Sequence, residues 1–415
     1  MAREQVLDGQ RLTRRRFGAL AAGGLASLVL PGCSDASQPE ATPAPEALGT
    51  APGPPRRVAL AAVPRGSAPE ATEKAVRAAA LAATDFAWLS RGDTVLIKPA
   101  CNSPNVYPAT TDPVALRAMI GLLRERGARR VIVADMSGVQ FVRFGKDHLS
   151  GSTRELMETA GMARAVLEAG AEVHAFEEAG WDGFFAEEPA ARGSWAGPLW
   201  LPNVLEEVDH VILMPRTSRH LLAGSTLALK TAVGWWRHDS RLEYHRDAAD
   251  LHAKTADANT VPSVTSRQRL VLSSATKVLS TFGPDTGTVS EPEIGLVFAS
   301  REPLSHDMLS LAWLVEARRK LPASKRSGMI DDPNTSKLAV NLMNRVVTYL
   351  LGGIPAALRM QRLSRHDLAS IWDDRTLRRA FELAGGVPRV ELADADGSCP
   401  PDLRERLEKE LTLSA

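Results

Sequence analysis

Polar residues that could bind or turn over an anionic ligand follow several short apolar runs of the sequence. They are Lys98 and Asn102, Asp135, Arg216 with Arg219 and His220, and Asp285. Lys230 lies in a more apolar stretch, between Leu229 and Thr231. Lysine and arginine favour phosphate and carboxylate groups, and histidine exchanges protons near neutral pH. We therefore expect an anion-binding crevice.

The residue types suggest a division of roles in this crevice. We expect Lys98, His220 and Asp135 to be catalytic, with His220 as acid, base or ligand. Asn102, Arg216, Arg219, Lys230 and Asp285 would bind the ligand. For Lys98 a second interpretation stays open, because a lysine at the end of an apolar strand often forms a structural ion pair.

The histidines raise the question of a metal. His238, His245 and His252 are spaced by seven residues, which on one continuous helix separates neighbours by about 10.5 Å, too far for one ion. A single metal could still combine residues from neighbouring loops, with His220, His245, Asp135 and Asp285 as candidates. The alternative is a polar helix face over residues 236–257.

The chain has three cysteines, Cys33, Cys101 and Cys399. An iron–sulfur cluster usually takes four thiolates, so we expect no such cluster in this chain. Cys101 follows Lys98 closely, and a nearby cation would lower its pKa. An inert thiol, or a disulfide with Cys399, are the other interpretations. Dinucleotide and P-loop glycine motifs are absent after the predicted strands.

Alternating strands and helices must position these residues. Short apolar runs predict strands at 58–63, 94–98, 131–135, 171–176, 208–214, 269–280 and 294–299. Helices are expected at 69–87, 112–126, 152–169, 303–320, 335–352 and 364–385. Asp112 is placed as a helix cap and Pro113 in the first turn. The pattern predicts an α/β domain over 57–352, mainly a parallel sheet with helices on both faces, and a helical extension over 353–415.

In a parallel sheet, the loops after the strands open at one edge, where ligands normally bind. The polar segments described above all follow predicted strands. We therefore expect them to share one crevice at the carboxyl ends of the strands.

The N-terminus has the features of an export signal. Arg14, Arg15 and Arg16 precede Phe17 and a 14-residue run broken only by Ser27, which is shorter than the about 20 residues of a membrane span. The paired arginines resemble the twin-arginine signal, which a translocase reads. We expect residues 1–32 to be removed and the protein to reach the periplasm or cell envelope. The alternative is a chance basic cluster before a buried helix.

Leu30-Pro31-Gly32-Cys33 resembles a lipobox, in which the cysteine carries a lipid. Residues 33–56 are rich in proline and alanine, a composition that predicts an extended tether. Simple cleavage without lipid is the alternative, because Pro31 departs from the usual small residue.

The length and the charge balance exclude one class of function. The 415 residues carry 50 basic and 49 acidic side chains, and this balance argues against a general nucleic-acid binder, which needs a basic surface.

The strand-end segments together resemble the domain-of-unknown-function 362 family. In order, they match a strand ending in Lys-Pro, a strand ending in Asp, Pro-x-x-x-x-His, Leu-Lys-x-x-x-Gly, Gly-Pro and a strand-to-helix segment with Asp. The matching positions are Lys98-Pro99, Asp135, Pro215 to His220, Leu229 to Gly234, Gly283-Pro284, and Ala299 to Asp307. The resemblance covers about residues 57–320 and implies this fold and a crevice.

The sequence departs from that family pattern at several points. Asn102 is displaced by two inserted residues, Ser218 replaces a lysine, and Thr231 stands where asparagine is common. The ferredoxin-like cysteine cluster of some members is missing, so a redox role would need a redox partner or a separate cofactor. Whether the crevice is intact stays open. The two functional hypotheses are an exported enzyme, redox- or metal-associated, and a non-catalytic envelope lipoprotein that binds an anion or a partner protein.

Overall fold

The computed structural model describes residues 48–326, 337–363 and 368–412. The expected signal, Cys33 and the first part of the predicted tether lie outside these residues. None of the helices in the described part of the chain has both the length and the apolarity needed to cross a bilayer.

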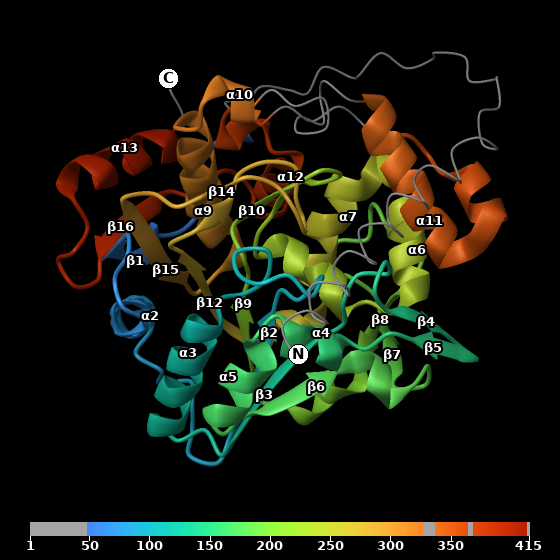
Figure 1. The fold of residues 1–415 in the computed structure, drawn as a ribbon, viewed down its shortest axis with the longest axis horizontal. Helices are drawn as coiled ribbons and strands as arrows, with labels where there is room; N and C mark the ends of the chain where they lie inside the picture. The colour runs from blue at the N-terminus through green and yellow to red at the C-terminus, as the bar shows by residue number, and fades with distance from the viewer. Residues whose placement is uncertain (1–47, 327–336, 364–367, 413–415) are drawn as a thin grey trace, which may run out of the picture. The chain divides into compact units, whose positions relative to one another are not determined.

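Eight strands form the main sheet (Figure 1). Their order is β16 (Val390–Asp394), β1 (Arg56–Pro64), β15 (Ile294–Ser300), β12 (Gln268–Ala275), β9 (His210–Met214), β2 (Thr94–Pro99), β3 (Arg130–Asp135) and β6 (Glu172–Ala175). β15 runs antiparallel to both of its neighbours, and the other pairs are parallel. The prediction of a mainly parallel sheet is confirmed.

Helices cover both faces of this sheet because successive strand side chains point to opposite sides. In β2, Val95 and Ile97 pack into a core with α2 (Pro69–Ala83), α3 (Pro113–Glu125), α4 (Thr153–Thr159) and α5 (Met162–Glu168). Leu96 faces the other side, in a core shared with η4 (Leu229–Trp235) and α6 (His238–Arg246). The expected helices on both faces are therefore present.

A third core lies around β1 and β15, which carry Leu60 and Phe298. It includes α9 (Pro303–Arg319), α12 (Arg375–Leu383) and α13 (Pro401–Leu411). The C-terminal segment also supplies β16, which pairs in parallel with β1 at the edge of the main sheet. The extension after residue 353 thus adds a strand as well as helices.

Several predicted helices differ from the observed ones for local reasons. Asp112 caps α3 as expected, because its side chain accepts a hydrogen bond from the Val114 backbone N–H. The helix expected at 152–169 is split, because Gly161 adopts a left-handed conformation between α4 and α5. The helix expected at 364–385 is shorter, since α12 starts after the capping residue Asp374.

The segment 236–257 is not one continuous helix. It divides into α6 and α7 (Leu251–Asp257), separated by the short helix η5 (Ala248–Asp250). The helix expected at 335–352 is observed from Lys337 and ends at Gly353, whose φ of 70° is not helical; α11 (Lys337–Arg359) comprises this helix and a second helical stretch after Gly353. His238 and His245 lie on α6 whereas His252 lies on α7, so the three do not share one helix face.

The remaining elements are short. They are β4 (Arg143–Gly145), β5 (His148–Ser150), η2 (Phe176–Ala179), β7 (Phe184–Glu187), β8 (Leu199–Pro202), η3 (Asn203–Glu207), β10 (Ser218–His220), β11 (Gly224–Thr226), η6 (Ala258–Thr260), α8 (Pro262–Thr265), β13 (Val278–Leu279), β14 (Val289–Ser290), α10 (Ala323–Arg326) and η7 (Ile371–Asp373).

The parallel register brings three strand ends to one edge. Pro99 at the end of β2 pairs with Met214 at the end of β9, and β3 ends beside them at Asp135. The loops after these strands carry the predicted site residues and start from the same edge of the sheet.

Candidate functional site

Lys98 and Asp135 form an ion pair at this edge. Lys98 Nζ lies 2.5 Å from Asp135 Oδ1, and the two side chains are only 1% and 4% exposed. Asp135 also accepts hydrogen bonds from the backbone N–H groups of Cys101 and Met136, both at 2.8 Å. Burial lowers the pKa of Lys98, and the charge of Asp135 opposes that shift. The ion pair that the sequence left as one interpretation of Lys98 is therefore present.

Gly234 lets helix η4 pass directly over this pair. A Cβ added to Gly234 would overlap Asp135 Oδ1 and Lys98 Nζ, and it would lie 2.9 Å from Lys98 Cε. The next residue, Trp235, places its ring centroid 5.4 Å from Lys98 Nζ, a cation–π distance. The glycine in Leu-Lys-x-x-x-Gly thus has a steric reason.

Arg216, just after β9, is the most unusual charged group of the site. Its side chain is 2% exposed, and its Nε and Nη1 atoms have no hydrogen-bond partner in the described structure. Burial lowers the pKa of Arg216, although Asp285, Cys101 and Asp135 pull it upward. A buried donor left unpaired costs about 1–3 kcal/mol. The folded protein therefore maintains an unfavourable buried cation that an anionic group could neutralise.

Lys230 is the second cation without a matched partner. No hydrogen bond or ion pair joins its amine to another described residue. Burial lowers the pKa of Lys230 to about 7, and the positive charge of Arg216 adds to this effect, while Asp285 opposes it. Near neutral pH this lysine is therefore divided between its charged and neutral forms.

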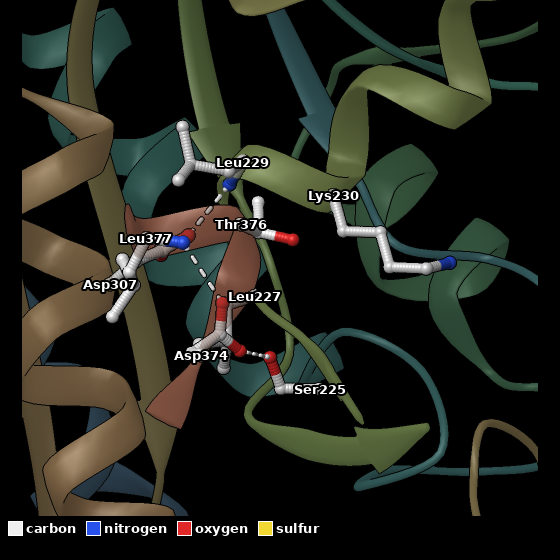
Figure 2. A pocket seen from close by; sticks show the side chains of 8 residues that line it. All are labelled: Ser225, Leu227, Leu229, Lys230, Asp307, Asp374, Thr376 and Leu377. Atoms are coloured by element: carbon white, nitrogen blue, oxygen red, sulfur yellow. Dashed lines mark hydrogen bonds between the residues drawn. The ribbon is translucent and has the colours of Figure 1, made fainter. Parts of the chain in front are cut away.

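Lys230 also lines a small hollow between η4, β11 and the start of α12 (Figure 2). Its other walls include Ser225, Asp307 and Asp374. Figure 2 shows the amine of Lys230 directed away from both carboxylates. The hollow therefore contacts the stem of Lys230, and its two acids do not neutralise the amine.

His220 is held as a neutral ring. Its Nδ1 accepts backbone hydrogen bonds from Leu222 and Ala223, at 3.1 and 3.2 Å. Burial, followed by the charges of Lys230 and Arg216, lowers its pKa well below the usual value. Because Nδ1 is an acceptor, the proton of the neutral ring sits on Nε2.

His245 has the opposite tautomer. Asn344 Nδ2 donates to the His245 carbonyl at 2.8 Å, which leaves Asn344 Oδ1 to accept from His245 Nδ1 at 2.8 Å. Burial lowers the pKa of His245 to about 4, so its Nε2 carries a free lone pair at neutral pH. A positive charge on His245 would lower the pKa of His220 further. The site thus combines a neutral donor ring with a neutral acceptor ring.

Asp285 connects the third loop to the site. Its Oδ1 accepts a hydrogen bond from Asn102 Nδ2 at 2.9 Å, and its backbone carbonyl accepts one from Asn105 at 2.7 Å. Its charge acts on both Arg216 and Lys230. The structure therefore brings Asn102, Asp285, Arg216 and Lys230 into one electrostatic group.

Arg219 is buried near this group but has a backbone partner. Its Nη1 donates to the Gly224 carbonyl at 3.1 Å, within the β10–β11 hairpin. Its charge contributes to lowering the pKa of His220. Arg219 thus fixes the hairpin that carries His220.

Two buried residues that organise the site were not predicted from the sequence. Arg241 on α6 is 4% exposed and donates to the carbonyls of Met136, Ser137 and Trp236, at 2.7, 2.5 and 2.9 Å. Burial lowers its pKa to about 10. The segment 236–257 has the composition of a polar surface helix, so no sequence signal marks Arg241.

Asp307 was included in the family motif but not in the predicted site. Its two carboxylate oxygens accept the backbone N–H groups of Ala228 and Leu229, both at 2.8 Å. His306 Nδ1 lies 2.9 Å from Asp307 Oδ1. Asp307 therefore anchors the start of η4 and positions Lys230.

The cysteine alternatives are narrowed by the structure. Cys101 and Cys399 are both free thiols, and Cys101 is 1% exposed. Of the interpretations of Cys101, the one in which a nearby cation lowers its pKa is contradicted, and the inert thiol is supported. Burial and the charge of Asp135 raise this pKa, which outweighs Lys98 and Arg216. Cys101 is therefore an inert buried thiol in this arrangement.

Three other described histidines have structural partners. His210 Nε2 lies 2.9 Å from Asp93 Oδ2, His238 Nδ1 accepts from the Phe144 N–H, and His252 Nδ1 lies 3.0 Å from Thr376 Oγ1. Among the described residues, no three His, Cys, Asp or Glu side chains are grouped closely enough to hold a metal ion.

A family model matches a large part of the chain. A family model described as "Domain of unknown function (DUF362)" matches residues 95–312, which span β2 to α9 and include every residue of the strand-end site except His245's partner Asn344. No curated protein matches the chain.

Proposed function

Because the chain belongs to the DUF362 family, whose domain has no known function, we propose a function from the site itself. The strand-end crevice binds a small molecule through a carboxylate or phosphate group and exchanges protons with it. The observation that carries this proposal is the buried guanidinium of Arg216, with two nitrogens lacking partners. Guanidinium groups bind planar oxyanions through paired hydrogen bonds.

The surrounding charges support an anion. Four basic groups, Lys98, Arg216, Arg241 and Lys230, interact here with three carboxylates, Asp135, Asp285 and Glu177. Lys98 is already paired with Asp135. Arg216 and Lys230 therefore supply the positive charge that the ligand neutralises.

The two neutral histidines provide the proton chemistry. His220 offers Nε2–H as a donor, and His245 offers the Nε2 lone pair as an acceptor. A base works best when its pKa lies near the working pH, and a bound anion would raise the low pKa values of both rings. In this scheme Asn102 and Asp285 orient the ligand, whereas the Lys98–Asp135 pair fixes the strand ends.

The experiment is titration calorimetry of the full-length protein with sulfate and with malonate. We expect the Arg216→Gln variant to bind each anion at least about tenfold more weakly, since a hydrogen bond to a charged group contributes about 1.5–3 kcal/mol. Arg154→Gln is the matched control, because Arg154 pairs with Glu178 on the surface. Equal affinity in the wild type and in Arg216→Gln contradicts the proposal.

The alternative is a non-catalytic envelope lipoprotein with the same anion site. Native mass spectrometry of the protein purified from its own compartment separates the two. A stoichiometric metal or coloured cofactor supports redox or metal chemistry, with the redox partner supplied from outside. A small anion alone, with no turnover of it by the purified protein, supports the binding protein.

We also propose that the protein is exported by the twin-arginine translocase and anchored through Cys33. The support is the order of Arg14, Arg15, the 14-residue apolar run and Cys33. Replacing both Arg14 and Arg15 with lysine should retain the protein in the cytoplasm. Cys33→Ser should leave export intact and release the protein from the membrane fraction in a high-salt wash, which the lipid-anchored protein resists. Normal envelope localisation of the double lysine variant contradicts export by this route.

A further inference from the structure

Helix α11 exposes an apolar surface. Val346, Tyr349, Ile354 and Leu358 are 43%, 51%, 61% and 60% exposed, and they form four of the ten large exposed hydrophobic side chains found in the described structure. The other six are scattered over different elements. Single exposed hydrophobic residues are normal, but a grouped set marks an interaction site.

The inner side of α11 is fixed to α6, so the outer side cannot turn inward. Asn344 and Thr348 are fully buried and both donate to the His245 carbonyl, at 2.8 and 3.3 Å. Gly353 interrupts α11, so Val346 and Tyr349 lie before the interruption and Ile354 and Leu358 lie after it, where Ala356 and Ala357 are buried. Figure 1 shows α11 alongside α6.

The charges of this segment all have one sign. Residues 337–363 contain Lys337, Arg345, Arg359 and Arg362 and no aspartate or glutamate. Apolar side chains combined with basic ones and a tyrosine are typical of helices that lie in the interface of an anionic bilayer. A second copy of this helix would bring the same basic charges against these, which disfavours self-association through α11.

We propose that the exposed surface of α11, formed by Val346, Tyr349, Ile354 and Leu358, rests on a membrane surface rich in anionic lipids. The four side chains enter the headgroup boundary, while the exposed Arg359 and Arg362 contact lipid phosphates. This inference does not depend on the anion site, because none of the four exposed side chains belongs to that site.

The test is a fluorescent probe at the surface itself. The full chain carries Cys33→Ser, so that no lipid is attached. A second substitution, Ile354→Cys, is labelled with an environment-sensitive dye. Cys101 and Cys399 are buried, so the dye reacts with the introduced cysteine. We expect a blue shift with vesicles of phosphatidylglycerol and phosphatidylcholine, and a much smaller one with phosphatidylcholine alone. Adding Leu358→Glu should raise the lipid concentration needed for half of the full shift at least about tenfold.

The matched control places the dye at Leu167→Cys on α5, where the side chain is 59% exposed. That label should not shift. No shift at position 354 at saturating lipid overturns the proposal, as do equal shifts with both vesicle types or at both positions. A shift without lipid that grows with protein concentration identifies a second copy of the chain as the occupant and also overturns it.

Discussion

Replacing Arg216 with methionine should stabilise the ligand-free protein while abolishing anion binding. The guanidinium is buried, and two of its nitrogens have no hydrogen-bond partner in the described structure. Methionine keeps the unbranched stem and removes the charge. A destabilising residue that folding tolerates is typical of a site built for a ligand.

The magnitude follows from two opposing effects. Two unpaired buried donors cost about 1–3 kcal/mol each, but Arg216 also attracts Asp285 and Asp135, and that attraction is lost. Replacing buried charged groups by apolar ones of similar size is stabilising by about 1–4 kcal/mol in favourable cases. We expect the free energy of unfolding to rise by about 1–4 kcal/mol in the absence of anions.

Arg241→Met is the matched control, and it should change the free energy of unfolding in the opposite direction. Arg241 is similarly buried, but it donates to the carbonyls of Met136, Ser137 and Trp236. Its removal leaves these acceptors unpaired, at about 1–3 kcal/mol for each buried group. We therefore expect Arg241→Met to be destabilised by several kcal/mol.

The assay is thermal unfolding followed by tryptophan fluorescence in a buffer free of sulfate and phosphate. Arg216→Met should melt a few degrees above the wild type, and Arg241→Met below it. Added sulfate should raise the melting temperature of the wild type and leave Arg216→Met unchanged. If Arg216→Met melts as low as Arg241→Met, the Arg216 guanidinium is satisfied by protein groups and the reasoning is refuted.

Three further outcomes test the site. Gly234→Ala should lose at least about 2 kcal/mol of stability in urea unfolding, since its Cβ would overlap the ion pair below it; Gly121→Ala, where the space is open, should be neutral or stabilising. Lys98→Met should lower the free energy of unfolding by about 3–5 kcal/mol, because it leaves Asp135 unpaired. Adding Asp135→Asn to this variant should recover part of that loss. If the losses of the two single variants simply add in the double variant, Lys98 and Asp135 are not coupled. Sulfate keeps its charge from pH 6 to 9, so its affinity should fall as pH rises through about 7, where Lys230 loses its proton; Lys230→Met should bind weakly with a flat calorimetric pH profile.

Part of the fold and of the site is readable in the amino-acid order. The apolar runs at 94–98 and 131–135 produce β2 and β3 because buried parallel strands are apolar throughout. Asp112 and Pro113 begin α3 as their types require. The placement of Lys98, Asp135 and Arg216 directly after strands follows from the same pattern.

The sequence could not indicate which residues would meet across the chain. Arg241 lies in a segment with the composition of a surface helix, yet its guanidinium reaches carbonyls about a hundred positions earlier. The sequence places a lysine near Cys101, which suggests a lowered pKa, but it does not reveal the full burial that raises the pKa instead. Burial and partner geometry depend on packing between distant segments.

The sequence by itself determined the α/β class, the strand ends that carry polar residues and the family to which the chain belongs, because these depend on local periodicity and residue order. Only the tertiary structure decided that Lys98 is paired while Arg216 is not, and that the two histidines have opposite tautomers. It also decided that α11 leaves an apolar surface exposed. Hydrogen-bond partners and desolvation are set by groups far apart in the chain, and they determine which of the predicted cations remains available for a ligand.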